Sequence, residues 1–205
     1  MARLEPPTAR ASGIILAGGS STRMGCDKAS LMLNGETLLA RTTRVLQEVV
    51  ETVSIVGWPA DREAQPGVSY LPDQLPDQGP LVSLAFALSH LRCPYALVVA
   101  CDLPFLRADV LRYLLADAPG WDAVVPRVGG RPQPLHAVYA RGVTDSAQQA
   151  SLDGERRMSA LLDRLKVRWI EEHEIIQLDP DLHSLMNVNT PGQWQAALQR
   201  TGAGI

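Results

Sequence analysis

The most restrictive feature of the sequence is an alternation of short apolar runs and amphipathic helical patterns over its first half. The apolar runs span residues 13–19, 52–58, 67–71 and 95–105, and the helical patterns span residues 36–50, 80–91 and 107–117. Short apolar runs bounded by glycine or polar residues are typical of strands buried on both faces of a parallel sheet. Strands that alternate with helices predict βαβ units, right-handed crossovers and a mainly parallel sheet.

The second half of the sequence continues this pattern less regularly. We expect strands at residues 122–128, 134–140 and 167–172, the first two around a turn at Gly129 and Gly130, and helices at residues 143–150, 157–165 and 191–200. The fold class is therefore α/β, and we expect one Rossmann-like, three-layer α/β/α domain over residues 12–200. Residues 1–11 are interpreted as a disordered lead-in, because prolines interrupt any helix there.

Composition and charge exclude several classes of protein. Of the 205 residues, 46% are hydrophobic and 20% are charged, which is ordinary for a soluble domain. The net charge of −3 argues against a partner that is nucleic acid or an anionic membrane. No apolar run approaches the roughly 18 residues of a membrane helix, and the first residues lack a signal-peptide core. The three cysteines form no CxxC pair, so we expect a cytoplasmic protein.

Two chemically distinctive segments follow expected strands. A glycine-rich loop with Arg23 and Lys28 follows the first strand, and Asp102 follows the apolar residues of the 95–105 run. Ligands of open α/β sheets collect at the carboxyl ends of the strands, so the loop and the aspartate should meet at one edge. Backbone N–H groups of a glycine-rich turn bind phosphate oxygens, and the loop therefore predicts a nucleoside triphosphate ligand.

The loop differs from two familiar phosphate-binding patterns. Five residues rather than four separate Gly19 from Gly25, Lys28 lies three positions further on, and GxGxxG is absent. A solvated surface loop is the alternative interpretation. However, the chain contains two lysines, Lys28 and Lys166, against seventeen arginines. A compact ammonium suits a phosphate contact where a planar guanidinium does not fit, which favours a functional role for Lys28.

The string LAGGSSTRMGCDK resembles the signature of the molybdenum cofactor guanylyltransferases, which belong to the wider nucleotidyltransferases. Further similar segments follow in family order: NGETLL, DQGPLVSL, CDLPF, RPQPLHAVY, GERR and MNVNTP. The resemblance spans residue 13 to about residue 194. It implies a sheet of the nucleotidyltransferase type, with the nucleotide site in the N-terminal half and the acceptor site in the C-terminal half.

The resemblance implies a set of nucleotide-binding residues. They are Leu16, Ala17, Gly18, Gly19, Lys28, Asp73 and Asp102. The first three would contact the guanine base and ribose largely through backbone atoms, and residues 19–25 would wrap the triphosphate. Asp77 competes with Asp73, because both lie in a doubled PDQ sequence, and a plain turn residue is the alternative for either.

Three residues are implied to act in catalysis, namely Arg23, Lys28 and Asp102. The two cations would offset charge at the α-phosphate, and Asp102 would bind Mg²⁺. One aspartate is enough, because Mg²⁺ fills its octahedron with phosphate oxygens and water. The alternative for Asp102 is a cap on the helix near residue 107.

The acceptor side is assigned to Asn187, Asn189 and Arg156. The asparagines flank Val188, so both side chains point the same way in an extended segment. Their alternative role is an N-cap network for the last helix. Arg156, with its neighbour Arg157, would meet the acceptor's phosphate, and the alternative is a solvated helix face. The four histidines lack metal-ligand spacing.

The implied reaction is transfer of GMP from GTP to the terminal phosphate of a molybdopterin-type cofactor, with release of pyrophosphate. Transient contact with proteins that deliver or receive the cofactor would accompany it. A general base is unnecessary, since a phosphate acceptor is already ionised near neutral pH. The alternatives are a cytidylyltransferase on the same cofactor, a nucleotidyltransferase for another small phosphate acceptor, and a non-catalytic nucleotide sensor or cofactor carrier. Residues 56–63 lack an asparagine often present in the family's nucleotide pocket, which leaves the base open.

Overall fold

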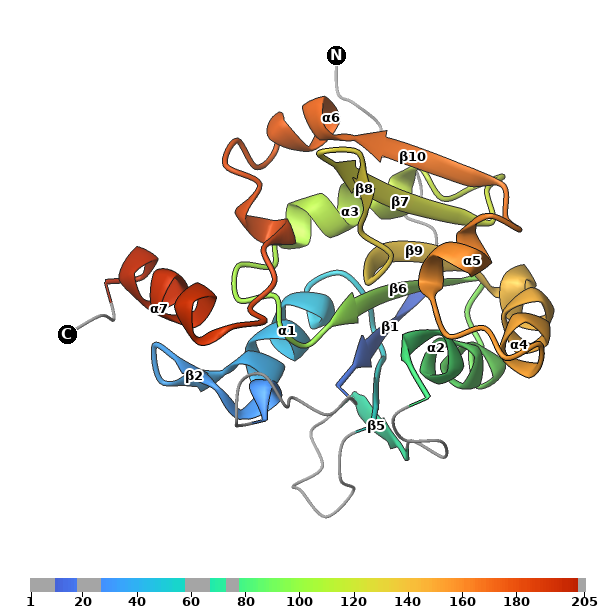
Figure 1. The fold of residues 1–205 in the computed structure, drawn as a ribbon, viewed down its shortest axis with the longest axis horizontal. Helices are drawn as coiled ribbons and strands as arrows, with labels where there is room; N and C mark the ends of the chain where they lie inside the picture. The colour runs from blue at the N-terminus through green and yellow to red at the C-terminus, as the bar shows by residue number, and fades with distance from the viewer. Residues whose placement is uncertain (1–9, 18–26, 58–66, 73–77, 203–205) are drawn as a thin grey trace.

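In the computed structural model, which describes residues 10–17, 27–57, 67–72 and 78–202, the apolar runs form strands of one sheet (Figure 1). The strands are β1 (Ala11–Leu16), β4 (Val53–Val56), β5 (Val68–Leu71), β6 (Tyr95–Ala100), β7 (Ala123–Val128), β8 (Arg131–Pro132), β9 (His136–Ala140) and β10 (Val167–Glu171). Their order is β5-β4-β1-β6-β9-β7-β10, with β8 beside β7.

The sheet is mainly parallel, as predicted. Strands β5, β4, β1 and β6 run parallel to one another, and β10 runs parallel to β7. Between these two blocks, β9 is antiparallel to both of its neighbours. It pairs His136 with Val99 of β6, and Tyr139 with Ala123 of β7. The chain reaches β9 from β7 through the predicted turn at Gly129 and Gly130.

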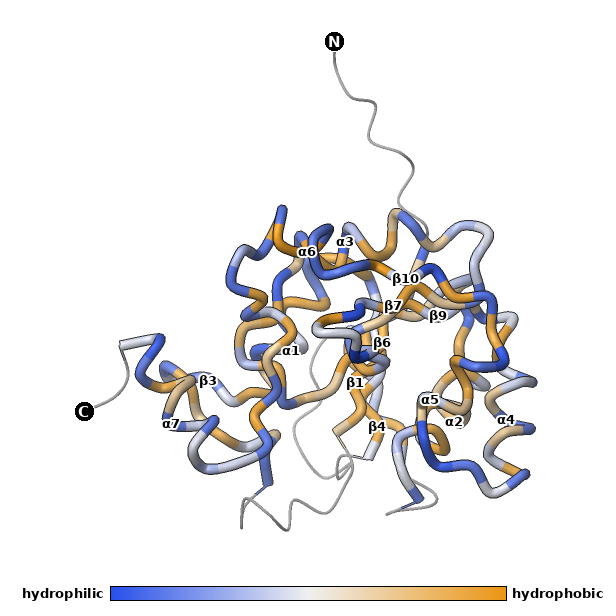
Figure 2. The backbone as a smooth tube through the Cα atoms, turned by 45° about the horizontal axis from the view of Figure 1, so that its top comes forward, coloured by the Kyte–Doolittle hydropathy of each residue, from blue (hydrophilic) through white to orange (hydrophobic). Residues whose placement is uncertain are grey.

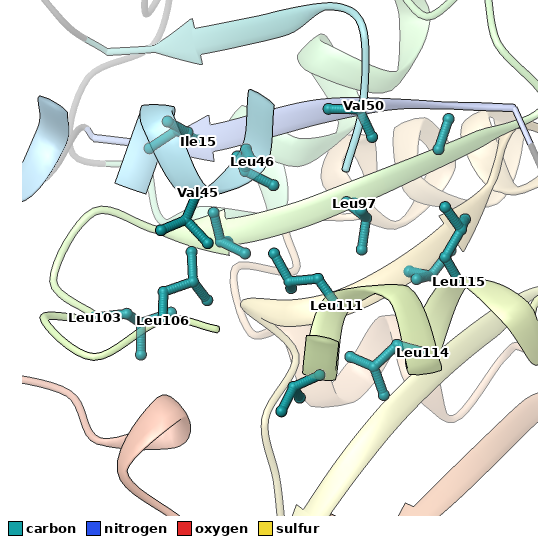
Figure 3. Packing of buried hydrophobic residues seen from close by; sticks show 14 of the residues in the cluster. Ile15, Val45, Leu46, Val50, Leu97, Leu103, Leu106, Leu111, Leu114 and Leu115 are labelled. Carbon is teal, nitrogen blue, oxygen red and sulfur yellow. The ribbon is translucent and has the colours of Figure 1, made fainter. Parts of the chain in front are cut away.

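Helices cover both faces of the sheet. On one face lie α1 (Leu38–Gln47) and α3 (Ala108–Ala116), and on the other lie α2 (Pro80–Ser89), α4 (Thr144–Leu152) and α5 (Met158–Leu162). Neighbouring residues of β1 enter different layers, since Ile15 packs against α1 (Figure 3) and Ile14 packs on the α2 side. The hydropathy pattern agrees, with apolar strands inside and polar segments outside (Figure 2). In the described ranges, no helix has the length and apolar character needed to cross a membrane.

The structure corrects three details of the sequence analysis. Ala11, placed in the expected lead-in, belongs to β1, where it pairs with Tyr95 and is 8% exposed. The helix expected from residue 36 begins at Leu38, because the Thr37 side chain caps it by accepting from the Ala40 N–H. The residues before it form an unexpected hairpin of β2 (Met32–Leu33) and β3 (Glu36–Thr37).

Two further elements follow β10. A short helix, α6 (Glu172–Ile176), was not expected, and it begins with a capping box between Glu171 and Glu174. The last helix, α7 (Pro191–Arg200), begins where predicted, at the residue after Thr190. It lies beside the β2–β3 hairpin in both views (Figures 1 and 2).

Candidate active site

The candidate site begins where two central strands end. Strands β1 and β6 are adjacent and parallel, and they pair Leu16 with Ala100 at their last residues. The Cys101 N–H then donates to the Leu16 carbonyl at 3.4 Å, and the Ala17 N–H donates to the Val56 carbonyl at 2.9 Å. The chain therefore leaves β1 toward the glycine-rich loop at the sheet edge where it also leaves β6 toward Asp102.

Lys28 returns to this edge at the start of a short 3₁₀ helix, η1 (Lys28–Ser30). Asp27 caps that helix, since its carboxylate accepts from the Ala29 N–H at 3.1 Å. The Lys28 ammonium donates to Asp102 Oδ2 at 3.0 Å and to Asn189 Oδ1 at 2.5 Å. These partners lie 74 and 161 positions away in the sequence, so the fold brings together three segments that the sequence keeps apart.

The C-terminal segment is fixed to Asp102 through its backbone. The Val188 N–H donates to the Asp102 carbonyl at 3.0 Å, and Val188 is fully buried. Asn187 Nδ2 donates to Asp102 Oδ1 at 3.4 Å, so both asparagines face the Lys28–Asp102 pair. Thr190 supplies the N-cap of α7 by accepting from the Gln193 N–H, and the Asn189 N–H joins the same network by donating to the Gln193 side chain. The asparagine side chains bond Lys28 and Asp102.

Two titratable groups near the site are held neutral. Burial raises the pKa of the Cys101 thiol to about 12, and the nearby Asp102 carboxylate adds to that shift. Burial lowers the pKa of His136 to about 4, although the Asp179 carboxylate acts in the opposite direction. The Ser184 backbone also acts in that opposite direction. The protonated thiol and the neutral imidazole carry no charge, so the charged groups around Cys101 are Lys28, Asp102 and Asp27.

Arg156 lies apart from the Lys28–Asp102 pair. It is exposed, and its guanidinium donates to the Ser151 and Glu155 carbonyls at 3.2 and 3.0 Å. Its backbone packs against Gly79, the residue before α2, where an added Cβ would lie 3.1 Å from the Arg156 carbonyl oxygen. The GERR and GPL segments therefore touch, which places Arg156 beside the start of α2.

Several residues implied by the resemblance lie outside the described residues. They are Gly18, Gly19, Arg23, Asp73 and Asp77. Leu16 and Ala17 are described, and the Leu16 carbonyl and the Ala17 N–H are both engaged in the sheet.

The donor atoms around Asp102 fit a hard divalent cation. They are the Asp102 carboxylate and the Asn189 amide oxygen, and oxygen ligands are those that Mg²⁺ prefers, whereas Asn187 turns its amide nitrogen toward Asp102. In the described part of the chain, no three His, Cys, Asp or Glu residues gather to hold a metal. The set therefore suits a cation whose remaining ligands are phosphate oxygens and water.

Sequence reasoning missed one positioning residue. Gln193, in the first turn of α7, accepts from the Asn189 N–H at 2.7 Å through its side-chain oxygen. It fixes the backbone of the residue that holds Lys28. A glutamine three positions after an expected N-cap threonine is the signal that could have identified it.

This edge of the sheet, with a lysine from the loop after β1 against an aspartate after β6, is that of an α/β nucleotidyltransferase. The family model for the MobA-like NTP transferase domain matches residues 13–169. The chain belongs to that family, and it is an enzyme that transfers nucleotidyl groups.

Individual relatives agree with this assignment. A probable molybdenum cofactor guanylyltransferase from Pelotomaculum thermopropionicum is 34% identical over 182 residues, covering 89% of each chain. A molybdenum cofactor guanylyltransferase from Desulfosudis oleivorans is 33% identical, covering 94% of this chain and 96% of the relative. The crystal structure of molybdopterin-guanine dinucleotide biosynthesis protein A from Archaeoglobus fulgidus matches with a TM-score of 0.80 at 26% identity, covering 93% and 98% of the two chains.

Proposed function

We propose that this nucleotidyltransferase transfers GMP from GTP to the terminal phosphate of a molybdopterin-type cofactor in the cytoplasm. The observation that carries the proposal is the contact between Lys28 and Asp102 where β1 and β6 end. The substrates come from the names of the relatives, which are molybdenum cofactor guanylyltransferases. Proteins that deliver or receive the cofactor would contact the enzyme transiently.

The reaction needs positioning and charge stabilisation more than proton transfer. The acceptor phosphate oxygen attacks the α-phosphorus in line, the bond to the bridging oxygen breaks, and pyrophosphate leaves with the electron pair. Lys28, with Arg23, stabilises the charge that develops on the phosphoryl oxygens. No base is required from Cys101 or His136, which agrees with their neutral states.

Asp102 would hold Mg²⁺, which neutralises charge on the phosphate oxygens when it is bound. Asn187 and Asn189 face the same point from the C-terminal segment, and there they would orient the reacting phosphates. Arg156 has an exposed guanidinium beside the start of α2 and would bind the acceptor's phosphate. Leu16, Ala17, Gly18, Gly19 and Asp73 complete the proposed nucleotide contacts.

Calorimetric titration with GTP, CTP, ATP and UTP in the presence of Mg²⁺ tests the choice of base. We expect GTP to bind most tightly. A preference for CTP would overturn guanylyl transfer while leaving the enzyme class intact.

Pyrophosphate release with the molybdopterin-type acceptor present tests the reaction itself. We expect release that requires both GTP and the acceptor. Binding of GTP without release under these conditions would favour a nucleotide sensor or cofactor carrier instead.

A further inference from the structure

The Asp102 carboxylate is paired with a cation of the protein itself. The Lys28 ammonium donates to Oδ2 at 3.0 Å, and the Asn187 amide donates to Oδ1 at 3.4 Å. The side chains of Lys28 and Asp102 are only 19% and 11% exposed, so water screens this pair incompletely. A Mg²⁺ ion bound about 2 Å from either oxygen would stand next to the ammonium and be repelled by it.

Lys28 is held in this place by a second partner. Asn189 Oδ1 accepts from the ammonium at 2.5 Å, and the Asn189 backbone is tied to Gln193 at the start of α7. Each contact of Lys28 is nevertheless a single-point bond from a flexible stem. A lysine of this kind can exchange partners without unfolding its surroundings, unlike a bidentate arginine fork.

We infer that Lys28 excludes a divalent cation from Asp102 until a nucleotide arrives. The ammonium and the cation compete for one carboxylate, and a triphosphate relieves the competition by giving Lys28 anionic oxygens to bind instead. The cation and the nucleotide therefore bind with positive coupling, and the metal enters together with the triphosphate. By linkage, each ligand raises the affinity for the other by the same factor.

This inference rests on the proposed role of Asp102 as the metal ligand, and Mn²⁺ alone is a suitable probe. Free Mn²⁺ is measured by electron paramagnetic resonance in titrations of the full chain, first without nucleotide and then with GTP, and the Mn²⁺ bound by GTP alone is measured without protein and subtracted. We expect the wild type to bind Mn²⁺ weakly until GTP is added. Lys28→Met should bind Mn²⁺ about tenfold more tightly than the wild type without nucleotide, and GTP should then raise its affinity less.

The chain offers a matched control in its other lysine. Lys166 donates to the Gly120 carbonyl at 3.1 Å and lies over the Trp121 ring, with no contact to Asp102. Lys166→Met removes the same charge and should leave Mn²⁺ binding unchanged. Lys28→Arg, which keeps the charge, should remain as weak as the wild type.

Nucleotide-free Lys28→Met that binds Mn²⁺ no more tightly than the wild type would overturn the inference. Lys28→Gln, which keeps hydrogen-bonding capacity, decides the question if the methionine variant does not fold. If Asp102 is not the metal ligand at all, a different result is expected. Asp102→Asn would then bind Mn²⁺ in the presence of GTP as tightly as the wild type does.

Discussion

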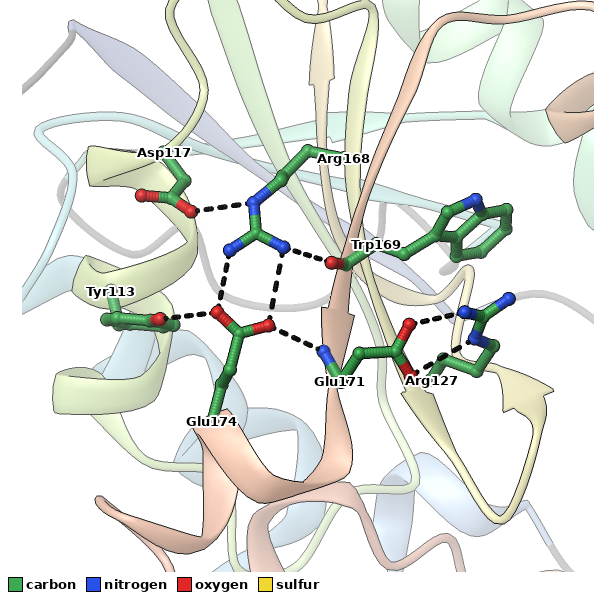
Figure 4. Close-up of polar contacts among 7 residues, drawn as sticks. All are labelled: Tyr113, Asp117, Arg127, Arg168, Trp169, Glu171 and Glu174. Atoms are coloured by element: carbon green, nitrogen blue, oxygen red, sulfur yellow. Dashed lines mark hydrogen bonds and ion pairs between the residues drawn. The ribbon is translucent and has the colours of Figure 1, made fainter.

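The Lys28–Asp102 pair in the middle of the sheet and the network around Arg168 at its β10 edge both join a cation to a carboxylate, but they are built differently. Arg168 donates to Glu174 Oε2 at 2.6 Å and to Asp117 at 3.1 Å (Figure 4). Glu174 also accepts from the Tyr113 hydroxyl at 3.1 Å and from the Glu171 N–H at 2.8 Å. Arg168 and Glu174 therefore each have several fixed partners.

The pKa values of Arg168 and Glu174 agree with this arrangement. The Arg168 guanidinium holds the pKa of Glu174 below its usual range, and Glu174 raises the pKa of Arg168. Lys28 instead makes one bond to each of two segments. The comparison teaches that an arginine fork with several partners suits a fixed structural role, whereas a point charge with single bonds suits the ligand contact that we propose for Lys28.

Asp102→Ala should cause the largest loss of activity. We expect GMP transfer to fall by about 10³-fold or more, because the variant loses the proposed metal ligand. The free energy of unfolding should change by less than about 1 kcal/mol, since the backbone carbonyl of residue 102 still accepts from the Val188 N–H. Pyrophosphate release and urea unfolding measure the two effects, and a variant with a tenth of wild-type turnover would contradict the assignment.

Lys28→Ala should cause the second-largest loss, about 10²- to 10³-fold in transfer rate. Lys28→Arg should recover only part of it, because the planar guanidinium differs in shape from the ammonium. Single-turnover rates, with thermal unfolding as a control, separate this loss from instability. Full activity in the alanine variant would make the Lys28–Asp102 pair structural, like the Arg168 network.

As the pH falls, buried His136 and the Glu174 of the Arg168 network should lose their contributions to stability in different pH ranges. The folded pKa of His136 is lowered from 6.5 to about 4, so the unfolded chain binds a proton that the folded chain does not. The contribution of neutral His136 to the free energy of unfolding, roughly 3 kcal/mol, is fully present above pH 6.5 and is lost as the pH falls toward 4. Glu174, whose folded pKa is also lowered, stabilises above its unfolded value near 4.5 and loses that contribution at still lower pH.

Urea unfolding at a series of pH values measures these slopes. His136→Leu should remove the slope between pH 6.5 and 4 whatever its cost at neutral pH. An unchanged slope in this variant would assign the effect to other groups.

Glu174→Gln should have the smallest effect, and on stability rather than turnover. We expect a loss of about 1–2 kcal/mol in the free energy of unfolding, because Arg168 loses its charged, bidentate partner, and a transfer rate within about twofold of the wild type. Asp153→Asn is the matched control. Its ion pair with Arg164 is 41% exposed on both sides, so the free energy of unfolding should hardly change. Equal losses in both variants would remove the distinction between a closed network and an exposed pair.

Much of the fold could be predicted from the sequence, because long apolar runs and helical stripes report burial directly. The exceptions are elements too short to have a period. The β2–β3 hairpin has two residues in each strand, and its Asn34-Gly35 turn, with φ of 53° and 80°, was the available signal. The α6 helix was missed for a similar reason, since it has five residues and follows β10 directly.

The residues of the candidate site were easier to predict from the sequence than the bonds between them. Lys28, Asp102, Asn187 and Asn189 were named from motifs, and the structure brings them together. The order of the strands predicted that the loop and Asp102 meet, but the bond between Lys28 and Asn189 could not be foreseen, because Asn189 follows the last described strand and no pairing rule places it. Arg156 was also named from its motif, but its position beside Gly79 depends on how the segments pack, which the motif does not report.

The position of Asn187 and Asn189 in the chain has a consequence for how the protein is made. Every strand that the structure describes ends before residue 172, whereas these asparagines follow it. During synthesis all the described strands of the sheet are therefore added to the chain before the residues that close on Asp102. A chain that stopped short of these asparagines would hold every described strand and still lack the segment that completes the site.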